Sequence, residues 1–240
     1  MKMLLATALT LVTGVAALAC DNKPTEGKPS ATVSDPVKPA PSGAASTATA
    51  PSAAASAAKG MIIAPTLTAP KGELLAITSE NSKIGFIGAK VTGKHEGKFQ
   101  KIAGVVDFVA AKPEDSRVKI AIDLSSVKTD QEKLDGHLQS PDFFDVAKYA
   151  IATFESTSVK AQKGPKGETH SITGNFSFHG IEKSITFPAE VTVKDDEVTA
   201  KASFGLNRKD FKVEYAGKAD DLIKDDVLVE LDLDLPRAKK

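Results

Sequence analysis

The feature that most constrains this chain is a period-two alternation of apolar and polar side chains, which recurs from about residue 71 to the C-terminus. It is clearest in residues 118–124, 172–178, 198–206 and 227–235. In the last of these segments every second residue is valine or leucine, and most of the residues between them are acidic. Side chains of a β-strand point alternately to its two faces, so each segment is predicted to be a strand with one dry face and one wet face.

These one-sided strands predict an all-β fold. Two short runs of turn-forming residues, 163–167 and 194–197, have the composition of hairpin loops. A series of one-sided strands joined by such turns favours an antiparallel sheet that either closes into a barrel or folds into a sandwich. The alternation does not distinguish a dry face that packs as a core from one that surrounds a ligand cavity.

One segment follows a helical pattern instead. Residues 129–132 read Thr-Asp-Gln-Glu, which matches a capping box in which the threonine caps the helix and the glutamate reaches back. Leu134 and Leu138 are four residues apart and share one helical face. The sequence therefore predicts a short helix near residues 130–140, which ends before Pro141.

Residues 1–19 have the organisation of a signal peptide. Lys2 provides a positive charge, and the run from Leu4 to Ala19 is uncharged and shorter than the roughly 20 residues that cross a bilayer. Cys20, the single cysteine of the chain, follows at once. We interpret Cys20 as the lipidated cysteine of a bacterial lipoprotein; the alternative is ordinary cleavage after Ala19, which leaves a free thiol.

Residues 20–70 are predicted to be a disordered tether that begins at the lipidated cysteine. The segment is rich in proline, alanine, serine and threonine, and such a composition cannot bury enough apolar surface to offset the entropy cost of ordering. Residues 71–240 then form one folded domain, large enough for a substantial core. We expect the protein on the periplasmic side of a bacterial cell envelope, attached to a membrane through Cys20.

The composition argues against several functional classes. Lys plus Arg and Asp plus Glu are equal at 31 each, so the chain lacks the basic excess typical of a nucleic-acid-binding protein. The histidines lack the spacing of a zinc site, and the aspartates of residues 220–226 lack the ordered pattern of a calcium loop. No phosphate-binding glycine loop and no serine nucleophile elbow occurs. We therefore expect no catalytic residue, no metal and no cofactor.

A longer motif follows the predicted helix. Residues 137–145 read His-Leu-Gln-Ser-Pro-Asp-Phe-Phe-Asp, and Tyr149 and the segment 151–154 (Ile-Ala-Thr-Phe) come next. This run resembles the helix-to-strand signature of the YceI-like family of polyisoprenoid-binding proteins. Shorter stretches agree with the family in order and spacing: 82–86, 97–99 with Gly104, 173–180 and 207–211. The resemblance covers about residues 73–236.

The resemblance implies an extended, lipocalin-like antiparallel β-barrel of about eight strands, whose lumen holds a polyisoprenoid, a quinone or a related lipid non-covalently, for transport, storage or sequestration. A long prenyl chain would need a volume in the upper part of the range of small-molecule pockets, about 300–1,000 Å³. We expect ten aliphatic and aromatic side chains to contact this ligand: Ile84, Phe86, Leu138, Phe143, Phe144, Phe154, Phe176, Phe178, Phe187 and Phe204.

Other functions stay open at this point. Taken singly, each of these phenylalanines is more typical of a packed core, and a filled barrel would act as a scaffold whose outer face binds an envelope partner. An enzyme acting on a lipid head group would need a titratable pair at the barrel mouth, for example His137 with an aspartate. We favour the non-enzymatic carrier, and the sequence leaves open whether it forms a homodimer.

Two polar groups are expected to have structural roles. His137, next to Asp142 and Asp145 in the motif, is expected to fix the corner between helix and strand by hydrogen bonding. Arg208 is expected to pair with Asp210, and the alternative is that it meets a polar ligand head.

Overall fold

The computed structural model describes residues 23–37, 62 and 64–238, and these form one α-helix, three short 3-10 helices and fourteen β-strands. The helices are η1 (Pro113–Asp115), η2 (Leu124–Ser126), α1 (Glu132–Gln139) and η3 (Arg208–Phe211). The strands are β1 (Thr32–Ser34), β2 (Glu73–Thr78), β3 (Ser82–Lys90), β4 (Gly93–Phe99), β5 (Ile102–Phe108), β6 (Arg117–Asp123), β7 (Val127–Thr129), β8 (Ile151–Ala161), β9 (His170–Phe178), β10 (Ile181–Val193), β11 (Glu197–Asn207), β12 (Gly217–Lys218), β13 (Asp221–Leu222) and β14 (Asp226–Pro236).

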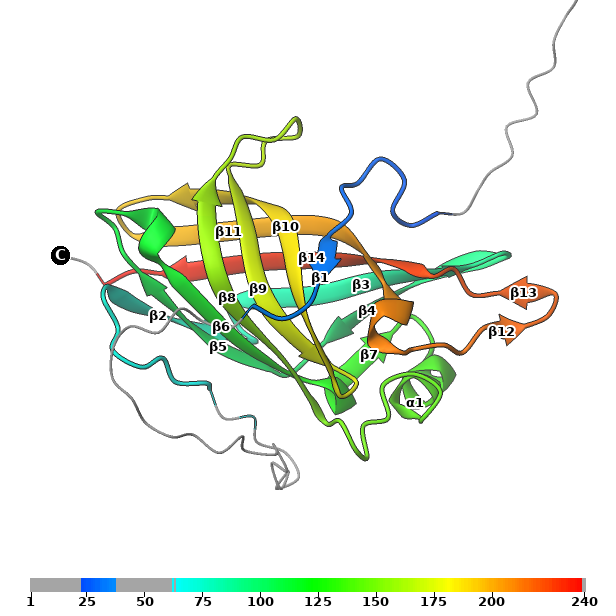
Figure 1. Ribbon diagram of the computed structural model, residues 1–240. Coiled ribbons are helices and arrows are strands. Elements are labelled where there is room, and N and C mark those ends of the chain that lie inside the picture. The colour runs from blue at the N-terminus through cyan, green and yellow to red at the C-terminus, as the bar shows by residue number, and fades with distance from the viewer. Residues whose placement is uncertain (1–22, 38–61, 63, 239–240) are drawn as a thin grey trace, which may run out of the picture.

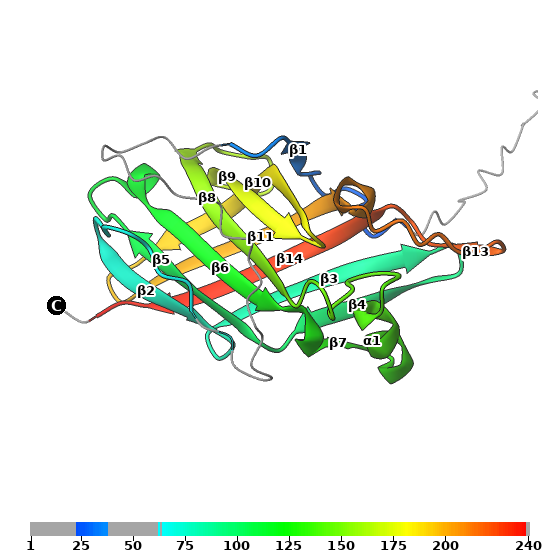
Figure 2. The same ribbon diagram turned by 60° about the horizontal axis from the view of Figure 1, so that its bottom comes forward.

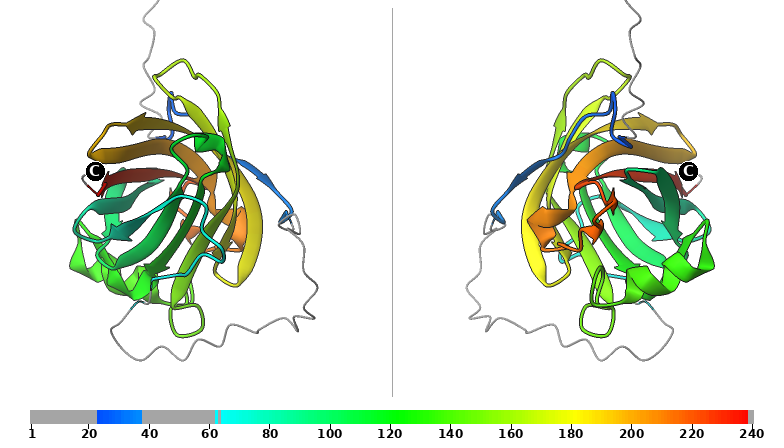
Figure 3. Two further views of the ribbon diagram at one scale, coloured as in Figure 1. Left: turned by 90° about the vertical axis from the view of Figure 1, so that its left-hand side faces the viewer. Right: turned by 90° about the vertical axis from the view of Figure 1, so that its right-hand side faces the viewer.

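Most of the strands belong to one antiparallel sheet (Figure 1). Its hydrogen-bonded order is β2-β5-β6-β8-β9-β10-β11-β14-β3-β4-β7, with β1 as a further partner of β10, while β12 and β13 form a separate hairpin. The sheet curls so that one face encloses an interior, as the end-on views of Figure 3 show. The helix α1 and the β12–β13 hairpin lie at one end of the barrel, and the C-terminal end of β14 lies at the other (Figure 2).

The predicted fold class is confirmed, in the form of an antiparallel half-barrel with one short α-helix. The four segments with the clearest alternation form β6, β9, β11 and β14, and the two predicted turns join β8 to β9 and β10 to β11. The sheet has twelve strands rather than about eight, because short strands such as β1 and β7 add to the longer ones.

The hydrogen-bonded ladder ends at β2 and β7, and contacts between β14 and the β2 region join the two sides of the barrel at the end away from α1. Arg237 donates from Nε to the Glu73 carboxylate at 3.0 Å, and its guanidinium lies 5.3 Å from the centre of the Phe108 ring. The backbone N–H of Asp234 donates to the Asn81 carbonyl at 2.9 Å. These contacts hold the curled sheet without a continuous ladder.

The helix begins later than the sequence predicts. α1 starts at Glu132, its N-cap residue is Gln131, and no side chain caps it, so the expected capping box at residues 129–132 is wrong. Thr129 is instead the last residue of β7, which pairs with β4, and its backbone N–H donates to the Asp135 carboxylate at 2.6 Å. None of the helices within the described residues is long and apolar enough to cross a membrane.

The N-terminal region differs from the expectation of a structureless tether. Within residues 20–70, residues 23–37 lie against the barrel and contribute β1, and residues 64–70 are also ordered, with Leu67 only 9% exposed. The prediction is wrong for these two stretches because contacts with strands far along the chain offset the entropy cost of ordering them. The predicted signal peptide, Cys20 and the rest of the tether lie outside the described residues.

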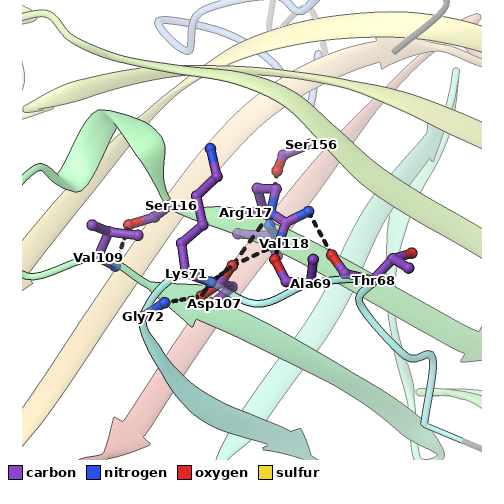
Figure 4. A network of polar contacts seen from close by, with 10 residues as sticks. All are labelled: Thr68, Ala69, Lys71, Gly72, Asp107, Val109, Ser116, Arg117, Val118 and Ser156. Atoms are coloured by element: carbon purple, nitrogen blue, oxygen red, sulfur yellow. Dashed lines mark hydrogen bonds and ion pairs between the residues drawn. The ribbon is translucent and has the colours of Figure 1, made fainter. Parts of the chain in front are cut away.

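A buried carboxylate fixes the segment that enters β2 (Figure 4). Asp107 has no exposed surface, and it accepts hydrogen bonds from Arg117 Nη2 at 2.7 Å and from the backbone N–H groups of Lys71 and Gly72 at 3.0 and 2.7 Å. The same guanidinium donates to the carbonyl oxygens of residues 68 and 69 at 3.2 and 2.9 Å. A single ion pair therefore holds the entering segment against β5 and β6.

We expect Asp107→Asn to lower the free energy of unfolding by about 2–3 kcal/mol, because the partly buried Arg117 loses its charged partner. The matched control is Asp115→Asn, which removes an exposed pair with Lys112 at 3.1 Å and should cost less than about 1 kcal/mol. Urea denaturation of the two variants and the parent measures both effects. A loss no larger than that of the control would contradict the structural role of Asp107.

The same carboxylate makes the stability of the fold depend on pH in the acidic range. Burial alone would raise the pKa of Asp107, but the hydrogen bonds from Arg117, Lys71 and Gly72 outweigh it and hold the pKa below its usual value of 3.8. Because the folded-state pKa is lowered, this group stabilises the fold above the unfolded-state value, and the contribution is lost as the pH falls through the folded-state pKa.

We therefore expect acidification from about pH 5 to below about pH 3 to destabilise the parent more than Asp107→Asn, which has no carboxylate to protonate at this position. Denaturant titrations across this interval provide the measurement. Parallel losses of unfolding free energy in both proteins would show that Asp107 does not carry this part of the acid sensitivity.

Candidate ligand-binding cavity

A cavity of about 300 Å³ lies inside the curled sheet. Its wall is built mainly from the inward faces of β3, β5, β6, β8, β9, β10, β11 and β14, and none of its exposed surface is polar. This character follows from the period-two pattern, because the apolar side chains that alternate with the wet ones all point into one enclosed space.

All eleven phenylalanines of the chain line this cavity. The ten side chains that the sequence predicts as ligand contacts, from Ile84 to Phe204, are all on its wall, including Leu138 of α1 and the Phe143–Phe144 pair that follows the helix. The fold therefore brings the predicted set together around one space. Their contact with a ligand stays a prediction.

Three further phenylalanines line the cavity but were not predicted from the sequence: Phe99, Phe108 and Phe211. Phe99 and Phe211 end the stretches 97–99 and 207–211, which carry part of the family resemblance, so a signal for them was present. Phe108 ends β5, which is buried on both faces and shows no clean alternation. The period-two pattern therefore could not assign Phe108 to the inner face.

Six rings near α1 form one continuous group, the helix-end cluster, which comprises Phe86, Phe99, Phe144, Phe176, Phe178 and Phe211. The centre of the Phe144 ring lies 6.3 Å from that of Phe86, 6.0 Å from that of Phe99 and 5.6 Å from that of Phe178. The Phe211 ring lies 5.9 Å from Phe178. Most of these rings meet edge-on or tilted, which is the preferred geometry of aromatic pairs.

A second group of rings lies on β8, β10 and β11. The centres of Phe154 and Phe187 are 5.7 Å apart, and Phe187 stacks on Phe204 at 4.3 Å with the planes 13° apart. Together with the helix-end cluster, these rings present flat carbon surfaces to the lumen. Such surfaces suit a slender hydrocarbon chain, which gains dispersion contacts along its length.

Glycines on neighbouring strands make room for two of these rings. A Cβ atom added at Gly97 would overlap the Phe86 ring, and one added at Gly174 would overlap the Phe154 ring and lie 2.6 Å from the carbonyl oxygen of Glu155. A close approach of this kind is a recurring reason for glycine inside a strand.

The cavity is smaller than a long prenyl chain was expected to need. Its volume of about 300 Å³ lies at the lower end of the usual range of about 300–1,000 Å³. The phenyl rings fill much of the interior, and alanines are among the small residues of the wall. Ala189 of β10 and Ala200 and Ala202 of β11 lie close together beside the Glu190–Lys201 pair.

A buried arginine holds the end of the cavity near α1. Arg208 is 7% exposed and donates to the carbonyl oxygens of Val213 at 2.6 Å and Lys224 at 3.1 Å, and to the Asp225 carboxylate at 3.1 Å. The expected pair with Asp210 is wrong, because Lys224 and Asp225, just before β14, and Val213, just after η3, supply the acceptors instead. The guanidinium therefore holds η3 in place, and Arg208 also lies on the cavity wall.

His137 lies outside the cavity, at the corner that follows α1. Its Nε2 is 3.0 Å from the Asp142 carboxylate, and its ring meets those of Phe143 and Tyr215 edge-on, at 4.9 and 5.1 Å. The expected role at the helix-to-strand corner is confirmed for Asp142, whereas Asp145 forms its ion pair with a lysine. With side chains 38% and 52% exposed, His137 and Asp142 face solvent rather than the lumen.

The acidic residues before β14 are engaged in ion pairs. Asp221 lies 2.6 Å from Lys90, and Asp225 lies 2.8 Å from Lys209. In the part of the chain that the structure describes, no group of three or more His, Cys, Asp and Glu side chains could hold a metal ion.

Comparisons with known proteins agree on one family. A model described as the YceI-like domain matches residues 75–235. A UPF0312 protein of Pseudomonas fluorescens is 33% identical over 140 residues, which cover 56% of this chain and 71% of that protein. A UPF0312 protein of Azotobacter vinelandii is 42% identical over 93 residues, which cover 39% of this chain and 47% of that protein.

Two solved structures share the fold. BcnA of Burkholderia cenocepacia has a TM-score of 0.59 and 22% identity, over 66% of this chain and 98% of that one. A polyisoprenoid-binding domain from Saccharophagus degradans, implicated in plant cell wall breakdown, has a TM-score of 0.54 and 17% identity, over 70% of this chain and 100% of that one. At these identities the likeness concerns the fold alone.

The close approach at Gly174 yields a stability prediction. We expect Gly174→Ala to lower the free energy of unfolding by about 1–3 kcal/mol, because the new methyl group overlaps the Phe154 ring and a backbone carbonyl. The matched control is Gly88→Ala, a strand glycine that lines the cavity, where an added Cβ meets no atom within 4 Å. It should be neutral or stabilising by up to about 1 kcal/mol, and equal denaturation midpoints for both variants would contradict this packing.

Proposed function

This chain belongs to the YceI-like family, and from that premise we propose that it is an envelope-tethered binding protein that holds a polyisoprenoid or a similar long apolar lipid in its barrel lumen. The observation that carries the proposal is the cavity itself. It is enclosed by the curled sheet, exposes no polar surface and is lined by every phenylalanine of the chain.

The chemistry of such a wall selects for hydrocarbon. Each Å² of apolar surface removed from water contributes about 25 cal/mol, so a prenyl chain binds without any polar partner. A charged or hydrogen-bonding group would lose its water in the lumen and gain no acceptor or donor there. The polyisoprenoid-binding domain of Saccharophagus degradans, which has the same fold, supports this choice of ligand class.

The small volume bears on how the ligand fits. A cavity of about 300 Å³ is at the lower limit of small-molecule sites. We infer that the lumen encloses one segment of a long chain or a short prenyl compound, unless the wall opens further. Affinity for ubiquinones with increasing numbers of isoprene units should therefore rise with the first units and then level off.

The role is binding rather than catalysis. His137 and Asp142, our example of a titratable pair for an enzymatic function, lie on the solvent side of the corner. The anchoring part of the proposal rests on the signal-like residues 1–19 and on Cys20. A membrane-attached carrier would stay close to the lipids that it takes up or delivers.

Native mass spectrometry tests the proposal directly. The full chain with Cys20→Ser, which carries no acyl group on that residue, should show a discrete added mass that disappears after organic extraction and matches a prenyl compound. An extracted chain that takes up neither ubiquinones nor polyprenols would overturn the carrier function. The filled scaffold would then be the better account.

We expect Ala202→Phe to weaken prenyl binding at least tenfold, because its ring would occupy the open side of the cavity. The matched control is Thr199→Phe in the same strand, whose side chain points to the opposite face and does not line the cavity. Titration with a short-chain ubiquinone, monitored by mass spectrometry, compares the two. Equal affinities would place the ligand elsewhere.

A further inference from the structure

β10 and β11 pair over only part of their lengths. Their ladder covers residues 190–193 of β10 and 198–201 of β11 and then stops. Residues 181–189 of β10 and 202–207 of β11, all of them described, form no backbone pairs with each other, and we call this stretch the β10–β11 split. Within it β10 still pairs with β9, and β11 still pairs with β14. The barrel wall is therefore divided between two ladders.

A segment from the N-terminal region fills this split. Residues 29–34, here called the N-terminal strap, include β1, which pairs with residues 184–186 of β10. On the other side, Gly205 of β11 accepts a hydrogen bond from the Ala31 N–H and donates one to the Pro29 carbonyl, both at 2.8 Å. Figure 1 shows the blue β1 beside the yellow β10, next to the orange end of β11.

The strap continues the pattern of the wall that it completes. Ala31 and Val33 are half-buried and pack against the main core, whereas Ser30, Thr32 and Ser34 are exposed. The alternation gives the strap one inner apolar face, as in the barrel strands. Its inner side chains are much smaller than the phenyl rings on the rest of the wall.

The split opens onto the cavity. Phe187 of β10 and Phe204 of β11 line the cavity and lie within the split, where they stack on each other. Ala189 and Ala202, part of the small-residue side of the wall, are the first residues beyond the last β10–β11 pair. A chain passing between the two strands would reach the lumen beside these alanines.

We propose that the N-terminal strap is a removable section of the barrel wall, and that its release from the β10–β11 split opens a side entrance through which an apolar chain reaches the cavity. The entrance rests on the proposed function, since it serves the same lumen. Both strands of the split keep a second ladder partner, so the sheet survives the release.

Further contacts of the N-terminal region, beyond the strap, suit a reversible attachment. The backbone of Val37 exchanges two hydrogen bonds with the Asn175 side chain, at 3.1 and 2.9 Å, and Asp35 pairs with Lys183 at 3.0 Å. These contacts are exposed, so water replaces them at little cost. Segments held in this way open locally before the core does.

Hydrogen exchange measures whether the strap detaches by itself. In the full chain with Cys20→Ser, we expect the amides of Ala31 and Gly205 to exchange at least tenfold faster than those of residues 228–231 in β14. Exchange of the strap amides as slow as that of β14 would overturn the proposal, because the strap would then leave only when the whole sheet unfolds.

A disulfide lock tests the entrance. Thr32 and Thr186 are direct partners in the β1–β10 register, and neither lines the cavity. Opposed residues of antiparallel strands have Cα atoms about 4.5–5.5 Å apart, within the range of a disulfide. Thr32→Cys with Thr186→Cys in the Cys20→Ser chain therefore gives a wall that is locked when oxidised and free when reduced.

The probe is all-trans-retinol, an isoprenoid alcohol whose fluorescence reports its transfer into an apolar site. We expect retinol to associate with the oxidised protein at least tenfold more slowly than with the same protein after reduction, at similar final occupancy. The control is Thr186→Cys alone in the Cys20→Ser chain, which should associate at one rate under both conditions.

The outcomes separate the entrance from the carrier function. Equal association rates for the locked and reduced forms would overturn the entrance and leave the carrier function standing. Retinol binding to neither form, even after long incubation, would overturn the carrier function instead. The exchange rates show whether the strap detaches while the sheet stays folded. Local exchange of Ala31 and Gly205 supports a removable wall section, and exchange as slow as that of β14 overturns it.

Discussion

A single sheet that curls on itself must fill its own interior, and this requirement organises the rest of the molecule. The inward positions are set by the period of the strands, and the eleven phenyl rings supply most of the volume. Glycines at positions 97 and 174 let two of these rings lie across a neighbouring strand. The cavity is the space that these inward side chains leave unfilled, and its apolar character follows from their type.

Two buried charged residues hold irregular segments at the two ends of the barrel. Asp107 and Arg208 are both almost fully buried, and each is satisfied by backbone groups as well as by an ion-pair partner. Each therefore anchors an irregular segment, the approach to β2 in one case and η3 in the other. Both charged groups therefore find their partners inside the protein.

The parts that the sequence could predict are those with a local pattern. The strands β6, β9, β11 and β14 follow from alternation, and the ten side chains that the family resemblance led us to expect around the lumen all lie on the cavity wall. The start of α1 was misplaced because Thr129 belongs to β7, and the partner of Arg208 was wrong because Asp225 comes from another segment. β1 could not be predicted, because three residues carry too little pattern and their pairing depends on where β10 and β11 diverge.

The N-terminal strap also sets the length of any leash between barrel and bilayer. Pro29 comes nine residues after Cys20, and a chain advances at most about 3.3–3.6 Å per residue, so an acyl group on Cys20 would lie within about 30 Å of the strap. Such an anchor would turn the β10–β11 side of the barrel towards the membrane while the strap is seated. Release of the strap would lengthen the leash and free the barrel to rotate. The height and the orientation of the barrel above the bilayer would then change at the same time as access to the lumen.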